Sequence, residues 1–334
     1  RFKIDDCYES IHSTYDADLK ILEERLFSKI QAPEIYEKYR HRIDYQSMMI
    51  QMGCYYLEQR LEEAIELEYS LRPYITKLTQ EELTFYLLVV TLIMMEKGQY
   101  LAALEIIQMN TWDDLQEKSD ILILKQFVEL LLAFKLNKEI LIHQLYFQTL
   151  ESLTHIQRFE EVIQIQFYYM IYHARFQSKK ATEIEMNSMK HLNDRQKYDI
   201  LAWSAFYHRQ YREVLEYAGD KPSVDTWKIY VIALQKEQNI SKIKSFFEGT
   251  FSFSKQTDFL FIQNYFKEKI ESDEQAFINY LRKDVLNLGV SFDDYFILEY
   301  LMIEIQQFFS QRYFYKDALL SFQYFYPKLK HGCS

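Results

Sequence analysis

The chain has 334 residues, of which 49% are apolar, and it contains only six Gly and four Pro. This apolar fraction excludes a disordered chain. The scarcity of Gly and Pro argues against strand-and-turn folds, which need both at their turns, and favours long helices. The formal net charge of −10 argues against nucleic-acid binding by this segment, because phosphate contacts require a cationic face.

Helix boundaries can be assigned along the first hundred residues. Pro73 is expected to stop the helix that opens at Leu61, because proline lacks the amide that a continuing helix needs. Residues 79–82, Thr-Gln-Glu-Glu, have the form of a capping box and predict a helix running to Gly98. The uncharged run between Glu82 and Glu96 is too short to cross a bilayer, and it predicts a buried helix.

Polar breaks divide the whole chain into about sixteen expected helices of roughly ten to twenty residues. The expected breaks lie near Gln59, Gly98, Asn110 to Asp114, Leu136-Asn137, His155 to Arg158, Gln177-Ser178, Gln210, Gln238-Asn239, Ser272 and Gln311. Gly219, Gly249 and Gly289 also interrupt the second half, and Pro327 is expected to end the last helix. The spacing of helix pairs, about thirty to forty residues, is near the periods of helical repeats.

One sequence step recurs five times, each time after a short polar break. A bulky residue is followed three positions later by Ala or Val, and then by Leu or Ile. The copies are Leu61/Ala64/Ile65, Tyr100/Ala103/Leu104, Phe159/Val162/Ile163, Tyr211/Val214/Leu215 and Tyr315/Ala318/Leu319. Residues three apart share a helical face, so the bulky residue is expected to fill the corner of a helical hairpin, and the small residue to let two helices approach closely.

The whole chain, residues 1–334, is therefore expected to form one all-α solenoid of stacked helical hairpins. No Gly/Ser-rich linker separates domains, and a softer joint is expected near residues 219–224. Such an array would be a right-handed superhelix with a charged convex face and a concave groove lined by Tyr, Phe, Asn, Gln and a few Arg or His side chains.

The hairpin corners resemble tetratricopeptide repeats. The residues that carry this resemblance are Ala318, Phe322, Phe325 and Pro327 in the last hairpin and Gly53, Tyr56 and Ala64 in the first. The first hairpin departs by one position from the usual spacing, and the second helical pair lacks the glycine.

Degenerate, Tyr-rich, Gly-poor and acidic repeats of this length resemble the peptide-sensing regulators of Gram-positive bacteria and their phages. This group includes the Rgg, Rap, NprR, PlcR and PrgX proteins and the arbitrium receptor. The resemblance implies a repeat domain that binds a short signalling peptide in its concave groove. It also implies a helix-turn-helix domain before the repeats as the only contact with DNA. Because the chain begins at Arg1 rather than Met, that domain is expected to be missing from this segment.

The richest candidate ligand surface is the run from Phe167 to Arg175. On a helix, Tyr168, Tyr172 and Arg175 share one face, with His173 beside it. An Arg at this place would hold a peptide carboxylate in a bidentate manner while tyrosines pack on peptide side chains. The alternative is that the rings belong to the hairpin core and that Arg175 is a solvated charge at the helix end.

Two further clusters are candidates for the same groove. Tyr207 and His208 lie in an aromatic and basic run, and core packing is the alternative for them. Gln263 and Asn264 have amides that pair with both the N–H and the C=O of an extended peptide. In the family that the chain resembles, Asn residues on inner helices have this role.

Neither catalysis nor a cofactor is expected. The eight histidines form no His-Glu-x-x-His pattern, the six glycines can hardly supply a phosphate loop, and no Gly-x-Ser-x-Gly occurs. Cys7, Cys54 and Cys333 are isolated, so neither a disulfide framework nor a zinc site is expected. With no visible signal peptide, these features predict reduced thiols in a cytoplasmic protein without a metal or a membrane partner.

Three functions remain open on the sequence. The first is peptide sensing by a regulator that dimerises through the aromatic C-terminal helices, where Phe308, Phe309, Tyr313, Phe314, Phe322 and Phe325 supply apolar rings. The second is a Rap-type phosphatase or response-regulator antagonist, in which Gln46 or Gln51 would face a partner; a solvated helix face is the alternative for both. The third is a plain scaffold for protein–protein contacts.

Overall fold

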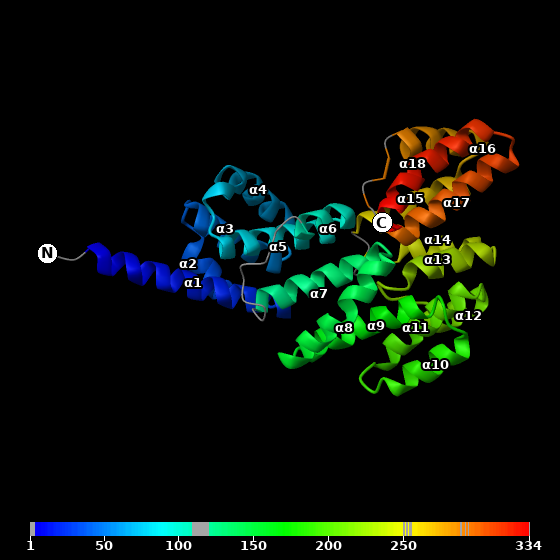
Figure 1. Ribbon diagram of the computed structural model, residues 1–334. Helices are drawn as coiled ribbons and strands as arrows, with labels where there is room; N and C mark the ends of the chain where they lie inside the picture. The colour runs from blue at the N-terminus through cyan, green and yellow to red at the C-terminus, as the bar shows by residue number, and fades with distance from the viewer. Residues whose placement is uncertain are drawn as a thin grey trace. The chain divides into compact units, whose positions relative to one another are not determined.

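The computed structural model describes residues 4–108, 120–249, 251, 253, 256–287, 289, 290, 292 and 294–333, without the side chains of 4–14, 120 and 331–333. Throughout this described part the regular secondary structure is helical, with eighteen α-helices and two short helices of other types (Figure 1). The chain forms two compact units. The first contains Arg1–Glu96 and Ala102–Glu129, and the second contains Lys97–Leu101 and Leu130–Ser334.

The first unit contains five complete α-helices, one 3₁₀ helix and most of two further helices. They are α1 (Ile4–Ser28), α2 (Pro33–Tyr39), α3 (Tyr45–Leu57), α4 (Leu61–Leu71), the 3₁₀ helix η1 (Arg72–Lys77), α5 (Gln80–Glu96), α6 (Tyr100–Gln108) and α7 (Asp120–Lys135). The expected capping box begins α5: the Thr79 amide donates to the Glu82 carboxylate at 2.8 Å, and the Glu82 amide donates to Thr79 Oγ1 at 3.3 Å. The run that this box opens is largely buried, as its lack of charge predicts.

A small residue lets three helices of the first unit approach one another closely. A Cβ atom at Gly53 on α3 would lie 2.9 Å from Leu22 Cδ2 of α1 and 2.9 Å from Phe85 Cζ of α5. Real Cβ atoms do not approach other carbon atoms so closely. Any side chain at position 53 would therefore force Leu22 and Phe85, or the helices that carry them, to shift.

The second unit contains eleven complete α-helices and one short π-helix. They are α8 (Glu139–His155), α9 (Phe159–His173), α10 (Lys179–Ser188), α11 (Asp194–Tyr207), α12 (Tyr211–Ala218), α13 (Trp227–Lys236), α14 (Ile240–Glu248), α15 (Thr257–Glu271), α16 (Glu274–Tyr280), the π-helix η2 (Leu281–Asn287), α17 (Tyr295–Gln311) and α18 (Tyr315–Cys333). Consecutive helices pack tightly as pairs, as α11 with α12, α13 with α14 and α17 with α18 (Figure 1). Residues 219–224 connect α12 to α13 inside this unit, and the softer joint there stays a prediction.

All five copies of the recurring step begin a helix, as predicted. Helices α4, α6, α9, α12 and α18 start at Leu61, Tyr100, Phe159, Tyr211 and Tyr315. The polar break before each is a turn whose residue two positions upstream has a positive φ: Gln59 (61°), Gly98 (72°), Gln157 (60°), Arg209 (59°) and Tyr313 (63°). Asn137 and Gln238 make the same turn before α8 and α14.

This turn ends one helix and starts the next. At Gln157, the Arg158 amide donates to Leu153 O at 2.9 Å, and the Gln157 amide donates to Thr154 O at 3.1 Å. The last carbonyls of α8 are thus satisfied by the left-handed C-terminal motif that usually takes Gly. Six of the seven turns have Gln, Arg, Asn or Tyr at this position instead of Gly, which explains how the chain makes so many hairpins with six glycines.

Replacing Gln157 with Gly should raise the free energy of unfolding by about 1 kcal/mol, because the left-handed conformation costs a side-chain-bearing residue roughly that much and costs Gly nothing. Gln157 is exposed at the hairpin corner. Urea unfolding measures the difference, and Gln157→Ala is the matched control with no expected gain. A Gly variant no more stable than the Ala variant would show that the turn carries no conformational strain.

The role assigned to the bulky first residue of the step is wrong in two of the five copies. The small residues are buried, with Ala64, Ala103 and Val214 fully inaccessible. Phe159 and Tyr315, however, are 58% and 63% exposed, so their rings do not fill the hairpin corner. The small residue is buried at every copy, whereas the exposure of the bulky residue varies from copy to copy.

The prediction that Pro327 ends the last helix is also wrong. Helix α18 continues through Pro327 to Cys333. Pro327 lies on the exposed face, whereas Phe325 and Leu329 on either side of it are buried, 0% and 7% exposed. Burial of this face holds the helix together beyond the proline, although proline removes one backbone hydrogen bond.

The aromatic C-terminal helices supply core as well as surface. Trp227, Phe259, Phe266, Phe309 and Phe325 are at most 1% exposed in one cluster of the second unit. Full burial of each such side chain contributes about 1.5–3 kcal/mol. Two of the rings expected on a dimer surface, Phe309 and Phe325, are therefore core residues.

The number of helices differs slightly from the number expected from the sequence. The described residues contain eighteen α-helices rather than about sixteen, and the break expected at Asn110 to Asp114 lies outside them. Among the described helices, none combines the length and the apolar character needed to pass through a bilayer.

Candidate functional site

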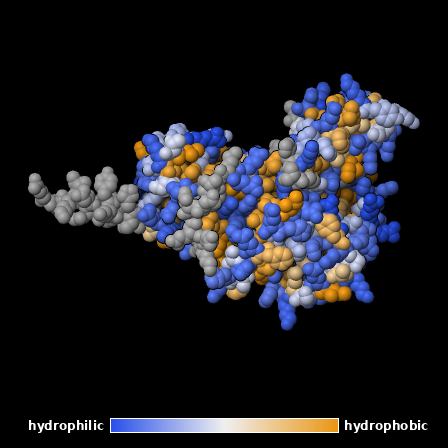
Figure 2. All heavy atoms as spheres, viewed as in Figure 1, coloured by the Kyte–Doolittle hydropathy of each residue, from blue (hydrophilic) through white to orange (hydrophobic). Residues whose placement is uncertain are grey.

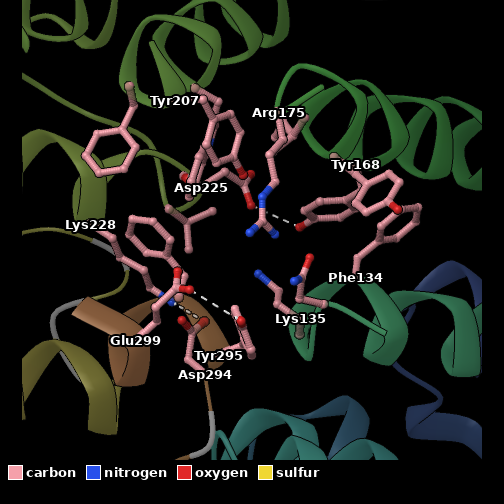
Figure 3. Close-up of a pocket in the computed structure, with 17 residues that line it drawn as sticks. Phe134, Lys135, Tyr168, Arg175, Tyr207, Asp225, Lys228, Asp294, Tyr295 and Glu299 are labelled. Carbon is pink, nitrogen blue, oxygen red and sulfur yellow. Dashed lines mark hydrogen bonds and ion pairs between the residues drawn. The ribbon is translucent and has the colours of Figure 1, made fainter. Parts of the chain in front are cut away.

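A cavity of about 230 Å³ lies within the second unit, where α7, α9, α11, α13 and α17 come together (Figure 3). Its lining is aromatic and charged. The aromatic residues are Phe134, Tyr168, Tyr172, Trp203, Phe206, Tyr207, Tyr295 and Phe296, and the charged ones are Lys135, Arg175, Asp225, Lys228, Asp294 and Glu299. Ile171, Asn137 and Val224 complete it.

One wall is fixed by Asp225, which lies between α12 and α13. The Tyr168 hydroxyl of α9 donates to Asp225 Oδ1 at 2.9 Å, and the Trp203 indole N–H of α11 donates to Asp225 O at 3.0 Å. Both hydrogen bonds join residues more than twenty positions apart in the chain. The wall is therefore held in place by tertiary contacts rather than by its own backbone.

The floor is fixed by a buried charge cluster around Lys228 on α13. Lys228 Nζ lies 2.8 Å from Asp258 Oδ2 and 2.7 Å from Asp294 Oδ2, and the three side chains are 10%, 9% and 6% exposed. Asp258 is in the first turn of α15, and Asp294 caps α17 by accepting from the Ile297 amide at 3.0 Å. One ammonium group therefore holds the N-termini of two helices against α13.

The charges in this cluster reinforce one another. Burial opposes ionisation of Lys228, but Asp294 and Asp258 outweigh it and raise the pKa of Lys228. Burial likewise acts to raise the pKa of Asp294, but Lys228 and then Lys135 outweigh it and lower the pKa. Lys228 and Asp294 are thus both ionised at neutral pH.

The remaining wall is aromatic. Phe296 of α17 packs edge-on against Trp203 and Phe206 of α11, with ring centroids 5.0 and 5.3 Å apart. Burial raises the pKa of Tyr172 to about 12 and also raises the pKa of Tyr207. Their hydroxyls are therefore neutral and available to donate or accept hydrogen bonds at neutral pH.

The cavity brings together four of the residues predicted from sequence: Tyr168, Tyr172, Arg175 and Tyr207. The first two lie on α9, Arg175 follows its end, and Tyr207 ends α11. The predicted face of α9 is therefore a cavity face.

The other four predicted residues lie elsewhere. The His173 ring packs on Tyr169, with centroids 4.7 Å apart, and contacts the Gln177 amide at 3.1 Å. His208 is exposed, and its Nδ1 lies 2.7 Å from Ser204 O. Gln263 and Asn264 border a separate hollow beside α14 and α15, where Gln263 Nε2 donates to Phe247 O at 2.9 Å.

The sequence reasoning missed most of the charged lining. Lys135 ends α7 just before a predicted break, Asp225 follows the predicted joint, and Asp294 begins α17. Each of these residues lies at or next to a helix end that the sequence pattern predicts, and this position is the only sequence signal that they share. Nothing local indicated that these ends meet.

Comparison with protein-family models, with curated proteins and with solved structures finds no match for this chain. The tetratricopeptide resemblance and the function that it implies are therefore untested. The described side chains include no group of three or more His, Cys, Asp and Glu arranged to hold a metal ion.

The glutamines considered for a phosphatase role are both engaged. Gln51 is buried rather than solvated, and its Nε2 donates to Tyr39 O at 2.8 Å and to Arg42 O at 2.9 Å. Gln46 Nε2 donates to Glu82 Oε1 at 2.6 Å. The solvated face expected for Gln51 is wrong, because its amide satisfies backbone carbonyls at the end of α2.

A further buried carboxyl, that of Asp199, interacts electrostatically with Asp225. Asp199 on α11 is 3% exposed, 3.1 Å from Arg195 Nε, and accepts from Thr226 Oγ1 at 3.4 Å. Burial raises the pKa of Asp199 to about 6, with Asp225 contributing and Arg195 opposing. This carboxyl is therefore partly protonated just below neutral pH.

The raised pKa of Asp199 should make the contribution of this residue to stability more favourable at pH 4 than at pH 8. Between pH 4, near the ordinary pKa, and about pH 6, Asp199 is protonated in the folded state but ionised in the unfolded state. The free energy of unfolding therefore falls as pH rises through this window. Asp199→Asn should remove that slope, worth about 2–3 kcal/mol, while keeping the side-chain shape. Urea unfolding at several pH values tests this, and an unchanged slope in the variant would contradict it.

Proposed function

We propose that this chain is a peptide-binding domain and that the cavity between α9, α11 and α17 receives part of a short peptide. The observation that carries this proposal is the lining: tyrosine, phenylalanine and tryptophan rings alternate with charged groups of both signs. A peptide presents apolar side chains, backbone amides and carbonyls, and isolated charges. A mainly apolar wall with a few fixed polar groups suits such a ligand.

The architecture proposed for this domain is a tetratricopeptide-like solenoid forming a right-handed superhelix. The tight pairing of consecutive helices and the repeated left-handed turn before α4, α9, α12 and α18 support it. Solenoids commonly bind extended segments on their inner surface. In the proposed solenoid, the cavity is part of this inner surface.

The biological role proposed is peptide sensing inside a bacterial or phage regulator of cytoplasmic location. The domain would exist in two conformations, and the peptide would bind one of them more tightly. Peptide binding would therefore increase the population of that conformation. DNA would be contacted only by an N-terminal domain outside this chain, because the chain itself carries a net charge of −10.

A homodimer through the C-terminal helices is proposed as part of this role. Tyr313, Tyr315, Leu319, Leu320 and Tyr326 are 43–79% exposed at this end of the chain. Phe322 stacks on Tyr326 with centroids 4.7 Å apart. Such a group of exposed aromatic and aliphatic side chains, on one long helix and in the turn before it, suits a partner helix of the same kind.

The two alternative functions have less support. The engaged amides of Gln46 and Gln51 disfavour a phosphatase role, which needs a glutamine free to position water. A plain scaffold predicts a broad flat contact surface, whereas apolar and polar side chains are interspersed over the drawn face of the second unit (Figure 2).

The proposal is tested by thermal unfolding of this chain in the presence of short synthetic peptides. The peptides have the sequences that are encoded next to the gene for this chain. A peptide at a hundred times its Kd should stabilise the domain by about 2.7 kcal/mol and raise the Tm accordingly. Val224→Trp places a large ring at the exposed rim of the cavity and should abolish the shift. Ile184→Trp, at an exposed site on α10 away from the cavity, is the matched control. An equal shift in both variants would place the peptide elsewhere, and no shift with any peptide would refute the function.

A further inference from the structure

We infer that the cavity is a receptor for the free C-terminal carboxylate of the peptide, held jointly by Arg175 and Lys135. This inference rests on the proposed function and names the part of the peptide that enters. The two cations come from different places, Arg175 from the turn after α9 and Lys135 from the end of α7. Figure 3 shows the guanidinium and the ammonium group pointing into the same central space.

Among the described residues, neither cation has a carboxylate partner at ion-pair distance. Arg175 lies over the ring of Phe176 at 5.8 Å, and Lys135 lies over the ring of Tyr168 at 5.3 Å. Beyond ion-pair distance, Lys135 still helps to lower the pKa of Asp294, and Arg175 acts to lower the pKa values of Tyr172 and Tyr207. The chain holds 49 acidic and 39 basic residues, so cations generally find acidic partners nearby. Lys228, in the same cavity, has two. Two unpaired cations directed at one space are the arrangement that an anion satisfies.

The acidic residues of the cavity limit the charge of that anion. Asp294 is occupied by Lys228, whereas Asp225 and Glu299 receive hydrogen bonds from Tyr168 and Tyr295, at 2.9 and 3.4 Å. These two carboxylates would repel a dianion such as phosphate. A monoanionic carboxylate flanked by amide N–H donors suits both the cations and the acceptors.

The size of the cavity favours an end of the peptide over its middle. Its volume of about 230 Å³ is below the roughly 300–1,000 Å³ of sites that enclose whole small ligands. Arg175 and Val224 at its rim are exposed, so the cavity opens to solvent on that side. A chain end enters such a space with its last side chain, against the Trp203 and Phe206 rings, while the rest of the peptide stays outside.

Binding of peptide pairs tests the inference. Each peptide that raises the Tm is synthesised in two N-acetylated forms, one with a free C-terminal acid and one with a C-terminal amide. Calorimetry then measures the affinity of both forms. Amidation should weaken binding by about 10- to 100-fold, because it removes a charge-assisted pair. In Arg175→Gln the acid should bind as weakly as the amide, and in Lys135→Gln the difference should shrink. Inorganic phosphate should not compete.

Arg209→Gln is the matched control, since it removes the same charge from an exposed residue outside the cavity, and Gln already occupies this turn position at Gln59, Gln157 and Gln238. It should preserve the preference for the acid. Equal binding of acid and amide would overturn the carboxylate receptor and leave peptide binding intact. Persistence of the preference in both cavity variants, or displacement by phosphate, would overturn it as well. Failure of every acid and amide to bind would refute the proposed function and this inference together.

Discussion

Replacing Lys228 with Met is expected to lower the free energy of unfolding by about 3–5 kcal/mol at pH 7. The change leaves Asp258 and Asp294 buried, 9% and 6% exposed in their side chains, without the cation that lies within 2.8 Å of both. A buried carboxylate that loses its partner keeps its unfavourable desolvation energy without the compensating attraction. Removing the lysine alone is therefore strongly destabilising. Urea unfolding of the variant and the wild type measures the difference.

The pH dependence separates this electrostatic cost from a packing defect. In the wild type the lowered pKa of Asp294 contributes stability above the ordinary pKa near 4, and that stability is lost as pH falls through the lowered value. In Lys228→Met, Asp294 loses the cation that lowers its pKa, so it is expected to gain a proton at a higher pH than in the wild type. The deficit of the variant should therefore shrink as pH falls from 7 toward 4.

Neutral partners provide the matched control. Lys228→Met combined with Asp258→Asn and Asp294→Asn removes all three charges and keeps an amide oxygen to cap α17. This triple variant should be more stable than Lys228→Met alone, because it leaves no buried unpaired charge. If the triple variant is the less stable of the two, the loss comes from packing and the electrostatic account is wrong.

Replacing Glu304 with Gln is expected to cost about 2–3 kcal/mol at pH 7. Glu304 on α17 is 10% exposed in its side chain and binds three donors: Gln235 and Lys236 of α13, both at 2.8 Å, and Lys269 of α15 at 2.9 Å. Burial acts to raise the pKa of Glu304, but Lys269 and the hydrogen bonds outweigh it and lower the pKa to about 2. One carboxylate thus links three helices of the second unit.

The sign of the pH effect follows from the lowered pKa. The contribution of Glu304 is present above its ordinary pKa near 4.5 and is lost as pH falls toward 2, so the difference between wild type and Glu304→Gln should vanish there. Glu271→Gln is the control, since Glu271 makes an ion pair with Lys244 at 47% exposure and should cost less than about 1 kcal/mol. Equal, pH-independent losses in both variants would show that Glu304 has no special role.

The helix starts were predictable because their signals are local. The residues that begin α4, α6, α9, α12 and α18, and the capping box before α5, each act within about one helical turn. The end of α18 was not predictable in this way. Pro327 signals a stop, but the burial of Phe325 and Leu329 against distant helices overrides it.

The candidate site was predictable only where it lies on one helix face. Tyr168, Tyr172 and Arg175 are spaced by four and three, and the structure places all three on the cavity. Lys135 and Asp225 required knowledge of which helix ends meet, and no local pattern carries that information. His173 shares the sequence neighbourhood of the site but turns to Tyr169 and Gln177 instead.

The sequence by itself determined that this protein is helical, where most of its helices begin, and that small residues separate paired helices. These properties depend on backbone hydrogen bonding and side-chain volume over a few neighbouring residues. Only the tertiary structure decided that Lys228 meets Asp294, 66 positions away, and that Arg175 and Lys135 face one cavity with no ion-pair partner among the described residues. The reason is physical: such meetings depend on the angles at which many helices pack, and each angle is set by the sum of contacts along the whole interface.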